Sequence, residues 1–330
     1  MTPRVALAVN PTSGRGRGAR AGASAARRLT DAGLQVSWLT GGDAAELGVR
    51  VRAAVADGVD ALVVVGGDGM VNLGVSTVAG TGLPLGIVPA GTGNDVARAL
   101  GLPVDDADAA ADAVGRALAT DTRQVVDAAR CAWREPDGSA GGRWFAGVLG
   151  AGFDAIVNER ANRWRWPRGR AKYVAAMLRE LPVFRPRAYT IELDGTVGVG
   201  GAEGTEVWST PAMLVAVGNG PSYGGGMRVT PDARLDDGLL DVMVVEPISR
   251  AELVRIFPRV YAGTHVDHPA VTIRRARCVT VAAPGIVGYG DGERFGPLPM
   301  TMEAVPRALQ VLAGRPAEVP GTARPPRHVM

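Results

Sequence analysis

The chain has 330 residues, of which 46% are hydrophobic and 21% charged, so it is globular and long enough for two domains with cores of their own. Its 36 basic and 33 acidic residues leave a net charge of +3, which is too small to indicate a nucleic-acid partner. Almost all basic residues are arginine, and Lys172 is the only lysine. A phosphate-binding lysine is therefore disfavoured, and phosphate would have to meet arginine, backbone N–H groups or a metal ion.

The cysteines and the apolar runs indicate a cytoplasmic protein. Cys131 and Cys278 show neither pairing nor metal-ligand spacing, so we expect two buried thiols in a reducing compartment. The apolar run Val5–Val9 ends at Asn10 and Pro11, which is too short for a signal peptide and predicts a first strand. No apolar run approaches the ~20 residues needed to span a bilayer. Any contact with lipid is therefore expected to be peripheral, at the inner face of the membrane.

Strands and helices alternate from residue 4 to about residue 120, which predicts an α/β domain with a mostly parallel sheet. Asp43 is expected to be the N-cap of a helix that stops before Gly58, and Asp105 to cap a later helix that reaches about Ala119. The expected strands are Val5–Val9, Gln35–Leu39, Ala61–Val65 and Leu85–Val88, and the first two expected helices are Ala19–Asp31 and Ala44–Ala56.

The pattern changes after about Asp121, where extended segments separated by Gly, Pro and Asp predict a β-rich antiparallel sandwich or barrel. Helices near Asp154–Leu181 and Arg250–Tyr261 are expected to be limited by Pro167 and Pro258. We therefore expect domains over residues 1–124 and 125–306, and a C-terminal segment over residues 307–330 with a disordered end. The expected strands are Gln124–Trp133, Arg143–Leu149, Tyr189–Asp194, Ala212–Val217, Leu239–Val245, Val271–Arg274, Val279–Ala283 and Pro299–Val305.

Two glycine loops follow neighbouring strands of the parallel sheet. They are Gly66-Gly67-Asp68-Gly69 and Pro89-Ala90-Gly91-Thr92-Gly93-Asn94-Asp95. A buried strand that ends in glycines and turns into a helix presents free N–H groups and the positive end of the helix dipole, which attract phosphate. A carboxylate repels phosphate, so its presence in these loops is explained by a bridging Mg²⁺. For Asp68, binding of a ribose or base hydroxyl is the other explanation. The alternatives are a plain Asp-Gly turn in the first loop and a helix cap by Thr92 or Asn94 in the second.

A third loop, Asn10-Pro11-Thr12-Ser13-Gly14-Arg15-Gly16, follows the first expected strand. Ligands of parallel α/β sheets bind at the carboxyl ends of the strands, so this loop is either a ligand loop or an ordinary flexible connection. It matches neither the Walker pattern nor the dinucleotide-binding pattern.

Taken together, these motifs resemble the diacylglycerol kinase catalytic family, which includes bacterial lipid kinases and sphingosine kinases. The resemblance begins with Asn10-Pro11-x-Ser13-Gly14, Gly66-Gly67-Asp68-Gly69-x-Val71-Asn72 and Pro89-x-Gly91-Thr92-x-Asn94-Asp95-x-Ala97-Arg98. It continues through Gly152-Phe153-Asp154, Asn219-x-x-x-Tyr223-Gly224-Gly225-Gly226, Asp236-Asp237-Gly238-Leu239-Leu240-Asp241 and Asp291-Gly292-Glu293. It implies an ATP-dependent lipid kinase with its active site in the cleft between a nucleotide domain and a β-rich lipid domain. It also implies that the final segment, near Arg307–Ala313, returns to the first domain.

The resemblance also implies roles for single residues. Glu293 would accept the proton of the lipid hydroxyl, and Asp291 would orient it or bind a second metal ion, although the two roles could be reversed. Asp68 and Asp95 would manage phosphate charge together with Mg²⁺. A structural Mg²⁺ would bind the carboxylate of Asp237 and the carbonyls of Arg234 and Leu239, where the residues alone indicate a plain β-turn. ATP contacts would come from Asn10, Pro11, Thr12, Ser13, Gly14, Arg15, Thr40, Gly66, Gly67, Asp68, Gly69, Met70, Val71, Asn72, Thr92 and Asn94.

The leading hypothesis is phosphorylation of diacylglycerol to phosphatidic acid. Met70 stands where the family usually has Thr, so a hydroxyl near phosphate is lost, and this motivates the alternative of a non-catalytic lipid- and nucleotide-binding regulator. The other alternative is a kinase for a sphingoid base or a phosphatidylglycerol-like lipid. We expect Arg163–Arg170, which mixes Trp and Arg, to dock on the membrane, and His265-x-Asp267-His268 to be a polar loop rather than a metal site. Strand edges of the β domain could pair in a homodimer.

Overall fold

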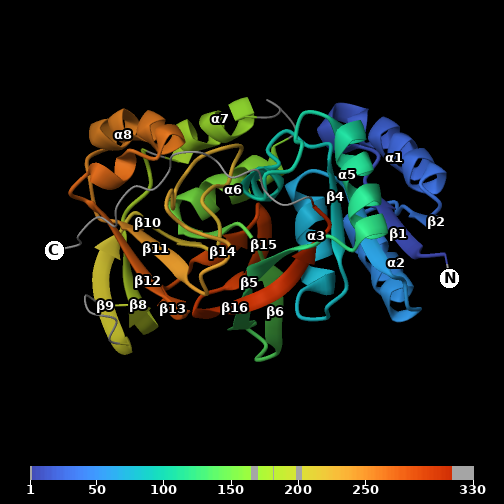
Figure 1. The fold of residues 1–330 in the computed structure, drawn as a ribbon. Helices are drawn as coiled ribbons and strands as arrows, with labels where there is room; N and C mark the ends of the chain where they lie inside the picture. Colours follow the sequence, from blue (N-terminus) through green and yellow to red (C-terminus); the bar gives the residue numbers. More distant parts are fainter. Residues whose placement is uncertain (1, 165–169, 181, 198–202, 314–330) are drawn as a thin grey trace.

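The computed structural model describes residues 2–164, 170–180, 182–197 and 203–313, and it divides into an N-terminal α/β part and a C-terminal β part (Figure 1). The N-terminal part has four parallel strands in the order β2-β1-β3-β4. Their Val-, Leu- and Ala-rich runs are buried on both faces, as expected for a parallel sheet between helices. The α/β fold predicted for this part is therefore confirmed. The strands are β1 (Arg4–Val9), β2 (Gln35–Leu39), β3 (Ala61–Gly66) and β4 (Leu85–Pro89).

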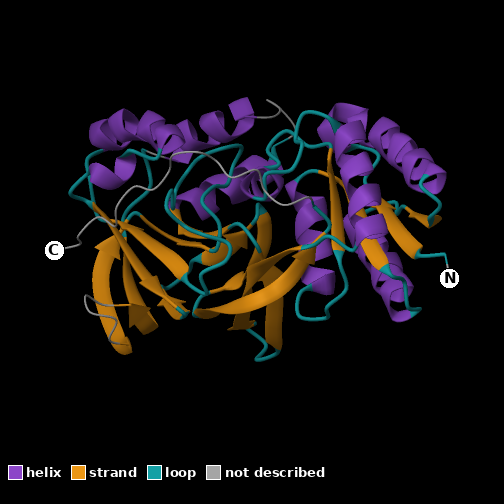
Figure 2. Ribbon diagram, in the orientation of Figure 1, coloured by secondary structure: helices purple, strands orange, loops and turns teal. Residues whose placement is uncertain are grey.

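Helices cover both faces of this sheet, as Figure 2 shows. Alternate residues of β1 separate the two cores: Val5 and Leu7 pack with α1 and α5, whereas Ala6 and Ala8 pack on the face of α2 and α3. The helices are α1 (Ser13–Asp31), α2 (Ala44–Ala56), α3 (Asp68–Val78), α4 (Asp95–Ala99) and α5 (Ala107–Thr120).

One predicted helix cap is found, one is displaced by a residue, and one helix begins earlier than predicted. Asp43 caps α2 by accepting the N–H of Glu46 at 2.8 Å, as predicted. The cap of α5 is Asp106 rather than Asp105, because Asp106 accepts the N–H of Ala109 at 2.9 Å. Helix α1 begins at Ser13 instead of Ala19, because its glycine-rich first turn packs against the end of β4 instead of forming a loop.

The C-terminal part packs two sheets around one core, which confirms the predicted β-sandwich. One sheet has the order β12-β11-β10-β7-β14-β15, and the other continues the N-terminal sheet through β4-β16-β13-β8-β9, with β5 beside β16 and β6 beside β5. The first strands are β5 (Gln124–Arg134), β6 (Ala140–Phe145), β7 (Val148–Gly152), β8 (Arg187–Val197), β9 (Glu203–Ala212) and β10 (Leu214–Gly218). The last are β11 (Leu240–Val245), β12 (Val271–Ala276), β13 (Cys278–Ala282), β14 (Val287–Gly290), β15 (Glu293–Pro297) and β16 (Met300–Val311).

The predicted strand Arg143–Leu149 is in fact two strands in different sheets, β6 and β7. The chain crosses between the sheets at Ala146 and Gly147, whose N–H groups bind a distant side chain, Asp291, instead of a neighbouring strand. Strands β9 and β15 were not predicted, whereas the sequence is strand-like over Ile286–Tyr289, where the structure has β14.

The last strand joins the two parts of the molecule. β16 pairs with β5 and β13 and then reaches β4, where Leu312 donates its N–H to the carbonyl of Leu85 at 2.8 Å. Leu309 and Val311 lie in the core beneath the N-terminal sheet. One ten-stranded sheet therefore runs through both parts of the chain.

Three helices cover the antiparallel sheet at the top left of Figure 1. They are α6 (Phe153–Arg163), α7 (Arg170–Glu180) and α8 (Arg250–Ala262), and a short 3₁₀ helix, η1 (His265–Asp267), follows. Helix α8 does not stop at Pro258 as predicted, because this residue lies at an exposed position where water can solvate the carbonyl group that loses its partner. Pro167 and the disordered end predicted from Arg315 onward lie outside the described residues.

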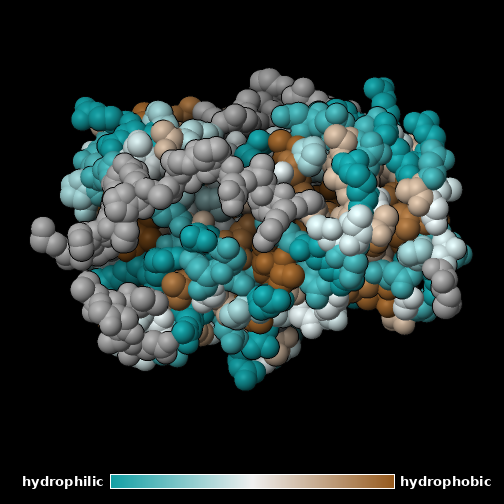
Figure 3. Space-filling view, viewed as in Figure 1, coloured by the Kyte–Doolittle hydropathy of each residue, from teal (hydrophilic) through white to brown (hydrophobic). Residues whose placement is uncertain are grey.

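Within the described residues no helix is long and apolar enough to cross a bilayer. In the space-filling view of Figure 3, hydrophobic residues show in separate patches within a mostly polar surface. Cys131 is buried and Cys278 half-buried, and both are free thiols.

Candidate active site

The three glycine loops meet at one edge of the parallel sheet. A Cβ atom on Gly91 would overlap the backbone of Gly67, and one on Gly14 would overlap the carbonyl of Ala90, so only glycine permits these approaches. The first turns of α1 and α3 lie at this edge, where Ser13 and Met70 donate their N–H groups to the carbonyls of Asn10 and Gly67, while the N–H groups of Gly14 and Gly69 have no partner within the described residues. The arrangement can therefore bind phosphate through the backbone.

Asp68 is the first residue of α3 and connects two of the loops. Its carboxylate accepts the N–H of Asp95 at 2.7 Å and that of Asn94 at 3.0 Å, so Asp68 caps α4 from another element. The cap expected from Thr92 or Asn94 is not formed, because the Asn94 side chain accepts the N–H of Gly91 instead. Burial, together with the negative charge of Asp95, raises the pKa of Asp68.

Asp95 joins the two parts of the molecule. Its two oxygens each accept one backbone N–H from the C-terminal part, from Gly225 and Gly226, both at 2.7 Å. The hydroxyl of Ser222 lies 3.3 Å from the same carboxylate. Three successive glycines, residues 224 to 226, all have positive φ angles, which allow the loop to wrap around this side chain. Asp95 is therefore a buried clamp between the α/β and β parts.

Asp291 and Gly292 form the two-residue turn between β14 and β15, with φ angles of +50° and +84°. Asp-Gly is the sequence typical of such a hairpin turn. The Asp291 carboxylate points inward and accepts the N–H groups of Ala146 at 3.1 Å and Gly147 at 2.9 Å. Burial raises the pKa of Asp291 to about 6.

Glu293 is exposed, and no hydrogen bond to its carboxylate occurs within the part of the chain that the structure describes. Its Oε1 atom lies 2.7 Å from where a Cβ atom on Gly69 would be, so the carboxylate rests against the first turn of α3. Of the four predicted catalytic carboxylates, Glu293 alone is uncommitted within the described residues, and all four line one cavity.

Only some of the predicted nucleotide residues that the structure describes line the cavity. Ser13, Gly14, Gly67, Gly69 and Thr92 line the cavity with Asp68. The side chains of Met70, Val71 and Asn72 are buried behind it, and Met70 packs beneath Gly66. Asn10 accepts the N–H and hydroxyl of Thr12, and Pro11, Thr12 and Thr40 lie near the same edge but outside the cavity lining. The side chain of Arg15 lies outside the described part of the structure.

The residues expected to hold a structural Mg²⁺ are arranged differently. The Asp237 carboxylate forms an ion pair with Arg275 and accepts the N–H of Leu239 at 3.1 Å. Nε of Arg275 lies 3.3 Å from the carboxylate of Asp241, while the Arg234 side chain pairs with Asp236. A Mg²⁺ ion on Asp237 would have to share this carboxylate with the guanidinium group of Arg275, so the set of Mg²⁺ ligands stays a prediction.

The cavity, about 730 Å³ in all, continues from the glycine loops into an apolar space beneath α6, α7 and α8. Asp154 and Tyr223 lie between the two ends, and the Tyr223 hydroxyl donates to Asp154 at 2.9 Å. Burial raises the pKa of Asp154 to about 6. The apolar walls were not predicted, because their residues come from seven distant segments. They include Phe153, Val157, Met177, Leu214, Met227, Val229, Met243, Val245, Ile248, Leu253, Ile256, Phe257, Val260 and Val271.

Of the two other stretches considered in the sequence, one contributes His265 to the apolar end of the cavity and the other lies largely outside the described residues. His265 is buried with its Nε2 atom 3.1 Å from the carbonyl of Val229, whereas Nε2 of His268 lies 3.0 Å from the Glu252 carboxylate. These imidazoles therefore face different partners. The segment proposed to dock on a membrane falls largely on residues 165–169, outside the described residues.

Comparison with known proteins agrees with this geometry. Residues 4–126 match the diacylglycerol kinase catalytic domain, and residues 147–313 match the YegS C-terminal NAD kinase beta sandwich-like domain. The chain is 43% identical over 312 residues to a diacylglycerol kinase of Mycobacterium tuberculosis (strain ATCC 25618 / H37Rv), covering 94% of this chain and 96% of that protein. It is 28% identical over 300 residues to a diacylglycerol kinase of Bacillus subtilis (strain 168), covering 90% and 91%. A crystal structure of a diacylglycerol kinase from Bacillus anthracis str. Sterne has the same fold, with a TM-score of 0.65, 20% identity and coverage of 94% and 97%. The chain therefore belongs to the diacylglycerol kinase catalytic family.

Proposed function

We propose that this protein transfers the γ-phosphoryl group of ATP to the hydroxyl of diacylglycerol, giving phosphatidic acid and ADP. The observation that carries the proposal is a single cavity with phosphate-binding loops and a free carboxylate at one end and apolar walls at the other. A lipid that is phosphorylated on its polar end requires these two environments side by side. The activity named for the 43% identical relative supports the same substrate.

ATP enters this scheme as its Mg²⁺ complex. The free N–H groups at the first turns of α1 and α3 would bind its phosphates, and the glycines at positions 14, 67 and 91 allow close approach. Asp68 keeps free lone pairs on the cavity side and would hold the Mg²⁺ that ATP brings, which neutralises phosphate charge. We assign Asp95 to holding the two parts in register, because its oxygens already accept two N–H groups.

Glu293 acts as the proton acceptor in this proposal. As the lipid oxygen forms its bond to the γ-phosphorus, the bond from that phosphorus to ADP breaks and the hydroxyl proton passes to the Glu293 carboxylate. The transition state is loose, so proton transfer comes late and an ordinary carboxylate is basic enough. Asp291 would fix the hairpin that carries Glu293, because its oxygens are bound to the backbone of Ala146 and Gly147.

The apolar space under α6 to α8 would hold acyl chain. Since a buried CH₂ group contributes ~0.8 kcal/mol, even part of one chain provides ample affinity. We therefore propose peripheral contact with the inner face of the membrane during substrate uptake. The alternative of a non-catalytic regulator was based on the loss of a hydroxyl near phosphate at Met70. The Met70 side chain packs into the core rather than toward phosphate, so this alternative is no longer supported.

The test is phosphate transfer from labelled ATP to a lipid panel in mixed micelles, comparing the parent with Asp68→Ala and Glu293→Gln. Glu192→Gln is the matched control, because Glu192 is an exposed carboxylate on β8, remote from the cavity lining. We expect diacylglycerol to be labelled, Glu293→Gln to lower kcat by ~10²–10⁴-fold with little change in the KM for ATP, and the control to match the parent. If no lipid is labelled above the level of the variants, the kinase proposal is wrong.

A further inference from the structure

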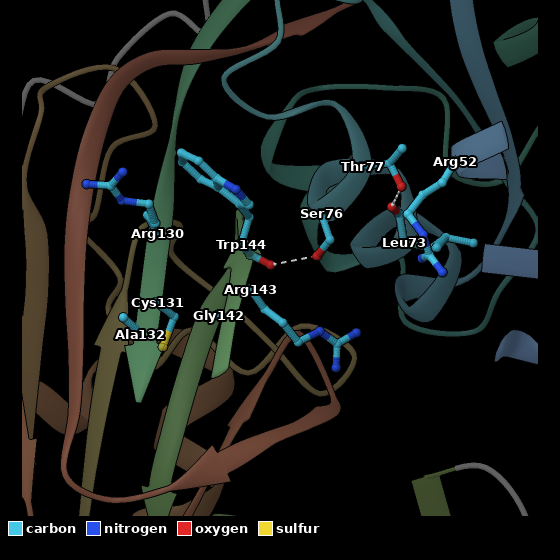
Figure 4. Close-up of a pocket in the computed structure, with 10 residues that line it drawn as sticks. All are labelled: Arg52, Leu73, Ser76, Thr77, Arg130, Cys131, Ala132, Gly142, Arg143 and Trp144. Carbon is cyan, nitrogen blue, oxygen red and sulfur yellow. Dashed lines mark hydrogen bonds between the residues drawn. The ribbon is translucent and has the colours of Figure 1, made fainter. Parts of the chain in front are cut away.

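Arg143 makes contacts that connect the proposed base to the phosphate-binding helix. It leaves β6 in the wall of a hollow of about 640 Å³ between α3 and strands β5 and β6 (Figure 4). Its guanidinium group donates to the backbone carbonyl of Arg294 at 3.0 Å and to Oδ1 of Asn72 at 3.1 Å. Its Cζ atom also lies 4.9 Å from the ring centre of Phe295. Arg143 therefore contacts both Arg294 and Phe295, which follow Glu293, and Asn72 of α3.

These contacts help to fix where Glu293 lies. Glu293 itself has no hydrogen bond within the described residues, so its position depends on the backbone of the β14–β15 hairpin. The hairpin is attached along β14, which pairs with β7, at its tip, through Asp291, and on its second strand, where Phe295 packs into the core and Arg143 binds the carbonyl of Arg294. The tip also reaches α3 through Asn72, whereas Arg143 connects the second strand to α3. Arg143 is therefore the side-chain contact that ties the strand carrying Glu293 to α3.

Arg143 also fixes the orientation of a buried amide. Asn72 is fully buried, and its Nδ2 atom lies 3.2 Å from the carbonyl of Trp144 and 3.4 Å from the carboxylate of Asp291. An arginine can only donate, so Oδ1 of Asn72 must face Arg143 and its NH₂ group must face Asp291. Without Arg143 the amide could turn its oxygen toward that carboxylate and weaken the hairpin tip.

The chain offers a matched comparison in the same hollow. Arg130 lies on the neighbouring strand and pairs with Glu303 at 2.6 Å, and Figure 4 shows its guanidinium group directed away from that of Arg143. Within the described part of the chain, no carboxylate pairs with Arg143. Its donors are committed instead to a backbone carbonyl of the hairpin and an amide of α3. This is the pattern of a positioning residue rather than a surface charge.

We propose that Arg143 is a positioning residue that holds the Glu293 carboxylate against the phosphate-binding turn of α3. The catalytic part of this proposal rests on the function proposed above for Glu293. An ångström of misplacement in an active site can lower the rate by about 100-fold, so Arg143→Ala should lower kcat by about that factor. The KM for ATP should stay within about twofold, because the glycine loops are untouched.

The experiment compares the parent with Arg143→Ala, Arg143→Lys and the control Arg130→Ala. Guanidinium chloride at tens of millimolar should partly restore kcat of Arg143→Ala, because the open hollow can admit the missing group, and should not raise kcat of the parent or of Arg130→Ala. Lysine keeps the charge but cannot donate to two carbonyls in a fixed fork, so its kcat should also fall. The lysine variant decides the question if the alanine variant does not fold.

Hydrogen exchange provides a readout that does not depend on catalysis. Amides of residues 287–297 should exchange faster in Arg143→Ala than in the parent, and those of Arg130→Ala should not. Unchanged exchange, unchanged kcat, or an equal loss in Arg130→Ala would each overturn the proposal. If the parent phosphorylates no lipid, the proposed function fails, whereas faster exchange of the hairpin would still support the attachment by Arg143.

Discussion

The clamp formed by Asp95 allows a sharp test of how the two parts of the molecule are held together. Asp95 is 5% exposed and accepts two backbone N–H groups at 2.7 Å from the loop at Gly225 and Gly226. The substitution Asp95→Asn keeps the size of the side chain. It removes the charge and replaces one accepting oxygen with an NH₂ group that would face another N–H.

The magnitude follows from those two bonds. A hydrogen bond to a charged group contributes about 1.5–3 kcal/mol, and a buried donor left without a partner costs about 1–3 kcal/mol. One of the two bonds is lost outright and the other loses its charge, so we expect the free energy of unfolding to fall by about 2–4 kcal/mol. At about 2–4 °C per kcal/mol for a large domain, this lowers Tm by roughly 4–16 °C.

The assay is thermal unfolding of the parent, Asp95→Asn and the control Asp57→Asn. Asp57 is exposed at the end of α2, so its substitution should change stability by no more than about 0.5 kcal/mol. A Tm of Asp95→Asn within 1–2 °C of the control would be a small fraction of the expected shift. In that case the assignment of Asp95 as a clamp between the two parts is wrong. A loss of kinase activity with an unchanged Tm would instead assign Asp95 to phosphate chemistry.

Three further predictions concern the loops, the core and pH. Gly91→Ala should weaken ATP binding, measured by calorimetry, and lower Tm, because its Cβ atom would overlap the backbone of Gly67. The control Gly142→Ala should change neither quantity, because a Cβ atom fits at Gly142. Met70→Thr should lower the free energy of unfolding by about 2–4 kcal/mol in urea titrations without tightening ATP binding, because the lost side chain is buried in the core. Burial raises the pKa of Asp154 to about 6 from its ordinary 3.8, so the folded state binds the extra proton and stability should fall as pH rises from about 4 to about 6. Asp154→Asn should reduce this decline, which is measured as Tm against pH. If Tm of the variant depends on pH as Tm of the parent does, the raised pKa of Asp154 is contradicted.

Local signals in the sequence were sufficient for much of the N-terminal part. The apolar runs of β1, β3 and β4 are buried on both faces, and the Asp43 cap acts within three residues of its own position, so both could be predicted. The start of α1 could not, because three glycines favour a loop and the helix gains its stability from packing against α5 and the strands β1 and β3.

Long-range contacts explain what the sequence did not reveal in the C-terminal part. The strand predicted over Arg143–Leu149 breaks at Ala146 because Asp291, 145 residues later, takes the N–H groups of the crossing. The apolar cavity is equally non-local, since it is assembled from helices and strands spread between Phe153 and Val271. Periodicity within a single segment carries no record of such partners.

The four carboxylates at the cleft show why motif residues alone do not reveal roles. Asp68 lies at the start of a helix and accepts the N–H groups of Asn94 and Asp95. Asp291 lies in a turn and accepts those of Ala146 and Gly147. Asp95 reaches N–H groups of a glycine loop from the other part of the chain. Glu293 begins a strand, has a longer side chain and lies against a glycine, where no backbone donor meets it in the described structure. This geometry supports the proposal that Glu293 accepts the proton, while Asp68, Asp95 and Asp291 hold the loops and the hairpin around it and Asp68 would also hold Mg²⁺.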